Sequence, residues 1–100
     1  FVHDEVYKYI VRLVTATRKS EMLDLGISPR GTLALSKMVQ ARAYLQKRDY
    51  VIPEDVAAVF PDVAVHRVRR SAKAKLNHKS EADVLSQILK DTPKPSPEKG

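Results

Sequence analysis

Side chains at the start of the chain recur at the spacing of one helical face. Between residues 4 and 19 this face holds Val6, Ile10, Leu13, Val14 and Thr17. Intervals of three and four residues bring side chains to the same side of an α-helix, so the pattern predicts a helix. Tyr7 and Val11 widen the stripe, and we therefore expect this helix to be well buried. Asp4 and Glu5 stand at its start, where carboxylates favour the positive end of the helix dipole.

The pattern changes after this helix, where Leu23, Leu25 and Ile27 alternate with polar or small residues. This alternation predicts an extended connection. Ser28 and Pro29 then mark the start of a second helix, because Ser caps first-turn amides and Pro needs no amide hydrogen there. We expect one face of this helix to be buried, comprising Ala34, Leu35, Met38, Ala41, Arg42 and Leu45.

Pro53 opens a third helix, after a short extended run at residues 50–52 and with acidic residues in its first turn. Its apolar side comprises Val56, Val59, Phe60 and Val63. Pro61 is expected to end this helix or to start another short helical piece. Ser80 caps a last helix that is predicted to end near Asp91. The buried stripe of this last helix comprises Val84, Leu85, Ile88 and Leu89.

These segments predict an all-α fold, a small bundle of four to five helices with short extended pieces near residues 50–52 and 67–71. A length of 100 residues with 43% hydrophobic residues fits one domain. We place this helical domain at residues 1–91. Residues 92–100 hold three Pro and two Lys and almost nothing apolar, which is typical of a disordered tail.

The composition excludes several kinds of chemistry. The chain has no Cys, and therefore no disulfide, thiol nucleophile or Cys-bound zinc. Its three His are dispersed without the spacing of a metal site, so no metal is expected. No phosphate-binding loop or nucleophile elbow is present, and this chain alone is not expected to be an enzyme. Without a signal peptide or a membrane-spanning apolar run, a chain beginning at Phe1 is expected to be a piece of a larger cytoplasmic protein.

The positive charge is concentrated in one stretch. The net charge is +6, yet residues 61–79 hold six Lys or Arg against Asp62 alone. These cations are Arg67, Arg69, Arg70, Lys73, Lys75 and Lys79. Such a stretch forms a solvated basic face or contacts nucleic acid, an anionic membrane or an acidic protein surface. A small basic nucleic-acid-binding or protein-docking module is therefore one interpretation, although no recognition helix or stacking aromatic accompanies the cluster.

The junction of Ser28, Pro29 and Arg30 is a candidate phosphate site. A helix N-terminus offers unpaired amides and the positive end of the dipole, and both favour phosphate. Arg30 adds a planar guanidinium that can hold two phosphate oxygens at once. Gly26 and Gly31 flank the junction and permit a close backbone approach. On these residues alone, a capped helix with an exposed Arg is the simpler interpretation.

Two strings carry a family resemblance, LGISPRGTLAL at residues 25–35 and ARAYLQKRDYVIPEDV at residues 41–56. Together with VAVHRVRRS at residues 63–71 and EADVLSQIL at residues 81–89, they resemble the C-terminal lid domain of MoxR-family AAA+ ATPases. The resemblance covers nearly the whole folded part, residues 1–91. The two main strings at this separation are fairly specific, whereas either string alone is weak.

The resemblance implies a small helical domain packed beside a nucleotide that a preceding α/β domain binds. Arg30 would be the sensor 2 residue that reaches the terminal phosphates of ATP, at a helix start formed by Ser28 and Pro29. The resemblance further implies ATP and Mg²⁺ in the full-length protein, with none held tightly by this chain alone. It also implies a ring of subunits, commonly a hexamer, and chaperone-like remodelling, often with a von Willebrand factor A domain protein as partner.

Two positions depart from the family pattern. Ile52 precedes Pro53 where a small capping residue such as Thr is usual, so we expect that helix start to be less well capped. Asn77 and His78 occupy a loop where the family often has an acid and a Gly. Neither departure affects the interpretation of Arg30.

Overall fold

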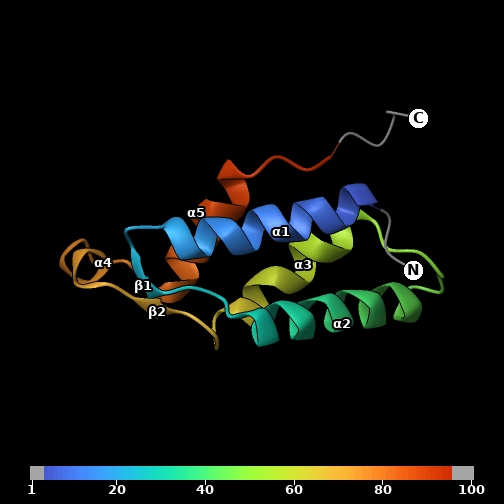
Figure 1. The fold of residues 1–100 in the computed structure, drawn as a ribbon, viewed down its shortest axis with the longest axis horizontal. Helices are drawn as coiled ribbons and strands as arrows, with labels where there is room; N and C mark the ends of the chain where they lie inside the picture. The colour runs from blue at the N-terminus through green and yellow to red at the C-terminus, as the bar shows by residue number, and fades with distance from the viewer. Residues whose placement is uncertain (1–3, 96–100) are drawn as a thin grey trace.

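The computed structural model describes residues 4–95, which form five helices and a two-stranded sheet. The elements are α1 (Asp4–Lys19), β1 (Leu23–Leu25), α2 (Pro29–Leu45), α3 (Pro53–Ala64), β2 (Arg69–Arg70), α4 (Ala72–Leu76) and α5 (Glu81–Asp91). Figure 1 shows α1 and α2 running along the long axis with α3 between them, and α2 forming one edge of the molecule. The predicted small helical bundle is confirmed.

Helix α1 supplies much of the core. All five residues predicted on its inner face are buried, and Tyr9 is fully buried beside them. Tyr7 and Val11 are 52% and 40% exposed, so the prediction that they widen the buried stripe is wrong. The stripe widens on the opposite side, because Tyr9 rather than Tyr7 points toward the neighbouring helices. Within the described residues, no helix is long and apolar enough to cross a membrane.

The small sheet joins two segments that are far apart in the sequence. Strand β1 pairs antiparallel with β2, with Leu23 opposite Arg70 and Leu25 opposite Arg69. The extended pieces predicted at residues 23–27 and 67–71 are therefore confirmed, and Leu23 lies in the core whereas Leu25 is half exposed. Residues 50–52 form no strand, although Ile52 has extended backbone.

Helix α2 buries a different face from the predicted one. Its buried residues are Gly31, Leu35, Val39 and Ala43, spaced four apart. Of the predicted set, Leu35 alone is buried, whereas Met38 and Leu45 are 51% and 76% exposed. The helix is rotated relative to the prediction because α3 packs on the side that carries Val39. The absence of a side chain at Gly31 lets Ile27 and Arg67 approach the helix closely.

The remaining helices follow the sequence more closely. In α3, Val56 and Phe60 are buried as predicted, but the helix continues through Pro61 to Ala64 instead of ending there. Pro61 lies in its last turn and has no amide hydrogen to donate to the carbonyl of residue 57. Helix α5 begins at the predicted cap, since the Ser80 Oγ accepts from the amide of Asp83 at 3.1 Å, and it ends at Asp91 as predicted.

The C-terminal residues after α5 lie partly within the described range. Residues 92–95 are irregular, and the Arg12 guanidinium donates to the Pro93 carbonyl at 3.4 Å. The rest of the predicted disordered tail, residues 96–100, lies outside the described residues.

Candidate nucleotide-binding site

The start of α2 is a capped turn. Ser28 has extended backbone, with φ −76° and ψ 167°, and its Oγ accepts from the Gly31 amide at 3.0 Å. The Ser28 carbonyl accepts from the Thr32 amide at 2.8 Å. Pro29 occupies the first helical position and has no amide hydrogen. The Arg30 amide is therefore a first-turn donor for which the described residues supply no acceptor.

The side chain of Arg30 is exposed at this helix start. Within the described residues it makes no ion pair and no side-chain hydrogen bond. The first turn of α2 also contains no acid, whereas α1, α3 and α5 all have acids there. An anion at this point would meet an unopposed helix dipole and a free guanidinium. The structure brings Ser28, Pro29 and Arg30 together, and their role toward nucleotide stays a prediction.

The loop before α2 is fixed to the end of α1. The Thr17 hydroxyl accepts from the Ile27 amide at 3.0 Å, and Arg18 Nε donates to the Ile27 carbonyl at 2.8 Å. Gly26 packs so tightly that a Cβ there would lie 2.7 Å from the Arg18 Cα. These contacts hold the connection that sets the position and direction of the α2 N-terminus.

Arg67 lies next to the same helix start, which the sequence did not reveal. A Cβ on Gly31 would lie 3.1 Å from the Arg67 Cδ and 2.9 Å from the Ile27 Cγ2. The aliphatic stem of Arg67 therefore crosses the first turn of α2. The available signal was a Gly inside a predicted helix, which often marks a close approach by another segment.

The opposite end of α2 is held by a buried ion cluster. Asp55 is fully buried and accepts from Arg48 Nη1 at 2.7 Å and Nη2 at 2.8 Å, and from Arg42 Nε at 3.2 Å. The Arg48 hydrogen bonds lower the pKa of Asp55, although burial opposes this shift. The carboxylate also accepts from the Ile52 amide at 2.9 Å, so Asp55 caps the helix start for which the Ile52 side chain offers no acceptor.

The other carboxylates with shifted pKa values make contacts that stabilise the fold. Backbone amides at the start of α5 lower the pKa of Glu81 and Asp83, and a hydrogen bond from Lys73 lowers the pKa of Glu21. In residues 4–95, no three His, Asp or Glu side chains gather as they would around a metal ion. The start of α2 thus offers a cation and amide donors and no metal ligands.

The basic stretch is only partly free. Lys73 pairs with Glu21 at 2.5 Å, and Arg70 Nη1 donates to the Lys79 carbonyl at 3.0 Å. The stem of Arg67 packs against Gly31. These contacts divide the stretch among several parts of the fold, so it does not present one uniform cationic surface.

Comparison with known proteins identifies relatives over most of the chain. The family model for the AAA lid domain matches residues 15–88. An uncharacterized protein of Bacillus subtilis, YeaC, is 38% identical over 86 residues, covering 86% of this chain and 27% of its own length. The chaperone MoxR1 of Mycobacterium tuberculosis is 38% identical over 98 residues, covering 89% of this chain and 26% of its own length.

A solved structure shares the fold. The crystal structure of a proposed ATPase from Cytophaga hutchinsonii superposes with a TM-score of 0.84 at 27% identity, covering 95% of this chain and 32% of that one. This chain therefore spans about a quarter of the length of the curated relatives above.

Proposed function

Because the chain belongs to the AAA lid domain family and is a lid of the MoxR type, we propose that it serves as the sensor 2 lid of an ATP-driven remodelling machine. The observation that carries the proposal is Arg30, an exposed guanidinium without a partner among residues 4–95, at the capped start of α2. A preceding nucleotide-binding domain of the same protein would hold ATP and Mg²⁺. That protein would act in the cytoplasm.

Arg30 would contact the terminal phosphates of the bound ATP. Charge spreads over the phosphate oxygens during phosphoryl transfer, and a fixed guanidinium stabilises that charge. The unpaired Arg30 amide and the dipole of α2 add to this preference for an anion. Ser28 and Pro29 hold the turn in the required shape, and the contacts of Ile27 to α1 keep the turn in place. The residues at this helix start therefore fit a phosphate group.

The same contact would couple nucleotide to movement of the lid. Arg30 has a partner while the terminal phosphate is present and loses it after hydrolysis and release, so ATP favours one lid position over another. In a ring of subunits, commonly a hexamer, this movement would be passed to neighbouring subunits and to a substrate. A von Willebrand factor A domain protein is the partner that the family resemblance implies.

The test is Arg30→Ala in the full-length ATPase. We expect turnover to fall roughly 10²-fold, as when one preorganised donor to transition-state charge is removed. Arg69→Ala, another exposed Arg of this chain, is the matched control and should keep near-normal turnover. Thermal unfolding of both variants checks that the lid remains folded. Normal turnover in folded Arg30→Ala would disprove the sensor assignment.

A further inference from the structure

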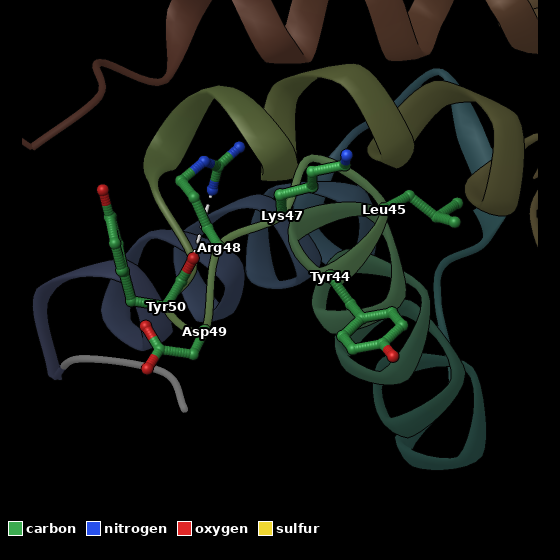
Figure 2. Close-up of a pocket in the computed structure, with 6 residues that line it drawn as sticks. All are labelled: Tyr44, Leu45, Lys47, Arg48, Asp49 and Tyr50. Carbon is green, nitrogen blue, oxygen red and sulfur yellow. Dashed lines mark hydrogen bonds between the residues drawn. The ribbon is translucent and has the colours of Figure 1, made fainter.

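The loop that joins α2 to α3 borders a hollow of about 770 Å³. Figure 2 shows Tyr44 and Tyr50 on opposite sides of this hollow, and these residues are 79% and 45% exposed. Exposed aromatic side chains that line one hollow mark a contact surface rather than a part of the core. The other lining residues are Leu45, Lys47, Arg48 and Asp49.

A second hollow of about 260 Å³ continues the first. The two hollows share the lining residues Tyr44, Arg48, Asp49 and Tyr50. Ala43 and Val51, which are buried, give the second hollow an apolar floor. The loop groove, as we name the two hollows together, therefore has aromatic walls and an apolar floor.

One wall of the loop groove is fixed before anything binds. Arg48 donates to the buried Asp55 carboxylate at 2.7 and 2.8 Å and to the Tyr50 carbonyl at 3.1 Å. Its guanidinium also stands 5.7 Å from the centre of the Tyr50 ring. Arg48 thus holds both the backbone and the ring of Tyr50. A preformed groove of this kind binds a ligand with little ordering cost.

Lys47, which lines the loop groove, has a strained backbone. Its φ of 63° lies in the left-handed region that favours glycine. The Arg48 amide donates to the Ala43 carbonyl at 3.0 Å, a bond typical of a helix end at which Gly follows the last turn. Strain of this kind is typical of functional sites, and here Lys47 adds an ammonium group to the groove.

The C-terminal end of this chain has the chemistry of a ligand for such a groove. We define the Pro-rich segment as residues 93–99, which read PKPSPEK and have Pro at every second position from 93 to 97. Pro-rich segments bind between aromatic side chains in the polyproline II form, and Pro reduces the entropy that they lose. Lys94, Glu98 and Lys99 carry both signs of charge, as Lys47 and Asp49 do in the groove. The segment can therefore pair its charges with those of the groove.

The Pro-rich segment begins on the far side of α1 from α2. Arg12 on α1 donates to the Pro93 carbonyl at 3.4 Å, and Pro93 and Lys94 line a hollow together with residues of α1, α3 and α5. In Figure 1, α1 stands between the red end of the described chain and α2. A second copy can present its segment to the loop groove without this obstruction.

We infer that the loop groove binds the Pro-rich segment of a second copy of this chain. Pro95 and Pro97 lie between the two Tyr rings, and Glu98 pairs with Lys47. Each copy carries one groove and one segment, so these contacts run from copy to copy and close in a swapped pair or in a ring. The inference goes beyond the proposed function, because it uses neither Arg30 nor nucleotide.

Disulfide cross-linking in the full-length protein tests this contact, since the chain itself contains no Cys. Leu45→Cys in the groove and Ser96→Cys in the segment are coexpressed as two differently tagged variants, in a background without other reactive cysteines. Leu76→Cys, at a residue 80% exposed on α4, replaces Leu45→Cys in the control. We expect about tenfold more disulfide between the two tagged chains with Leu45→Cys than with the control, because docking raises the effective concentration of the thiols.

Two further changes test the chemistry of the contact. Pro95→Ala together with Pro97→Ala in the segment should lower cross-linking to Leu45→Cys about tenfold, because the segment then loses more entropy on binding. Tyr44→Ala in the groove should lower it by about as much, because an aromatic anchor is removed.

Two results would overturn the inference. One is equal cross-linking of Ser96→Cys to Leu45→Cys and to Leu76→Cys. The other is a disulfide that closes within one chain when that chain carries both Leu45→Cys and Ser96→Cys and no second copy is linked, because the occupant is then the segment of the same chain.

A matched pair of glycine variants tests the role of Lys47. His78 has a φ of 57° at the end of α4 and so has the same backbone strain away from the loop groove. Lys47→Gly and His78→Gly should both raise the melting temperature, because Gly adopts this conformation without strain. Lys47→Gly alone should lower the cross-linking of Ser96→Cys to Leu45→Cys, because it removes the ammonium group that pairs with Glu98. Equal cross-linking in the two glycine variants would overturn the pairing of Lys47 with the segment.

Discussion

Asp55 is a single buried charge on which the local structure of two helices depends. Its carboxylate accepts hydrogen bonds from two Arg side chains and from the Ile52 amide. It thereby joins the C-terminal half of α2, the following loop and the start of α3. The sequence predicted a structural role for this acid at a helix start, but not its ion pairs, because nothing local indicates that Arg42 and Arg48 turn toward it.

We expect Asp55→Asn to lower the free energy of unfolding at neutral pH by about 2–3 kcal/mol, because the Arg48 guanidinium loses its carboxylate. The bound Arg48 lowers the pKa of Asp55 below its ordinary value of 3.8, so this stability is present above that pH and is lost as the pH falls through the native pKa. The difference in the free energy of unfolding between Asp55→Asn and the parent should therefore shrink in acid. Urea unfolding at several pH values measures it.

The exposed neighbour Glu54 provides the control for this change. Glu54→Gln should alter the free energy of unfolding by less than about 0.5 kcal/mol, as is usual for surface substitutions. If Asp55→Asn lowers the free energy of unfolding by the same amount at neutral and acidic pH, the charge of Asp55 does not supply this stability.

At the scale of the element, the sequence predicted the starts of α2, α3 and α5 and the buried sides of α1 and α5, but not the buried side of α2. The caps at Ser28 and Ser80 are where the sequence placed them. Helix α2, however, carries two rows of apolar or small residues, and periodicity cannot choose between them. The row with Val39 is buried because α3 packs there. Pairing of β1 with β2 likewise depends on contacts between distant segments that no local pattern encodes.

Substitution of Gly31 tests whether the start of α2 is closely packed. Ala normally stabilises a helix relative to Gly, by about 1 kcal/mol. Here the added Cβ would lie 2.9 Å from the Cγ2 of buried Ile27, so we expect Gly31→Ala to destabilise the domain by about 1–2 kcal/mol instead. Thermal unfolding measures the change, with Ser36→Ala in the same helix as the control that should be neutral or stabilising. A higher melting temperature for Gly31→Ala would rule out the steric conflict.

At the scale of the whole molecule, function could be predicted only through the family resemblance. Net charge drew attention to residues 61–79, whereas the candidate site depends on Arg30, one cation in a nearly balanced part of the chain. The Ser-Pro-Arg string located this residue, and the structure places it at the exposed helix start. Arg67 could not be predicted as its neighbour, because Arg67 is far from Gly31 in the sequence and only the folded chain brings them together.

The distribution of charge also predicts how this chain behaves toward DNA. Non-specific binding depends on how many phosphates are neutralised together, and here Lys73 is paired with Glu21 while Arg70 is bonded to a backbone carbonyl. We therefore expect duplex DNA to bind without sequence preference, with a dissociation constant of roughly 10⁻⁴ M or weaker at physiological salt. Fluorescence anisotropy over a salt series measures this, and Glu21→Gln, which frees Lys73, should tighten binding slightly. Tight, sequence-selective binding would instead favour a nucleic-acid-binding module over a lid.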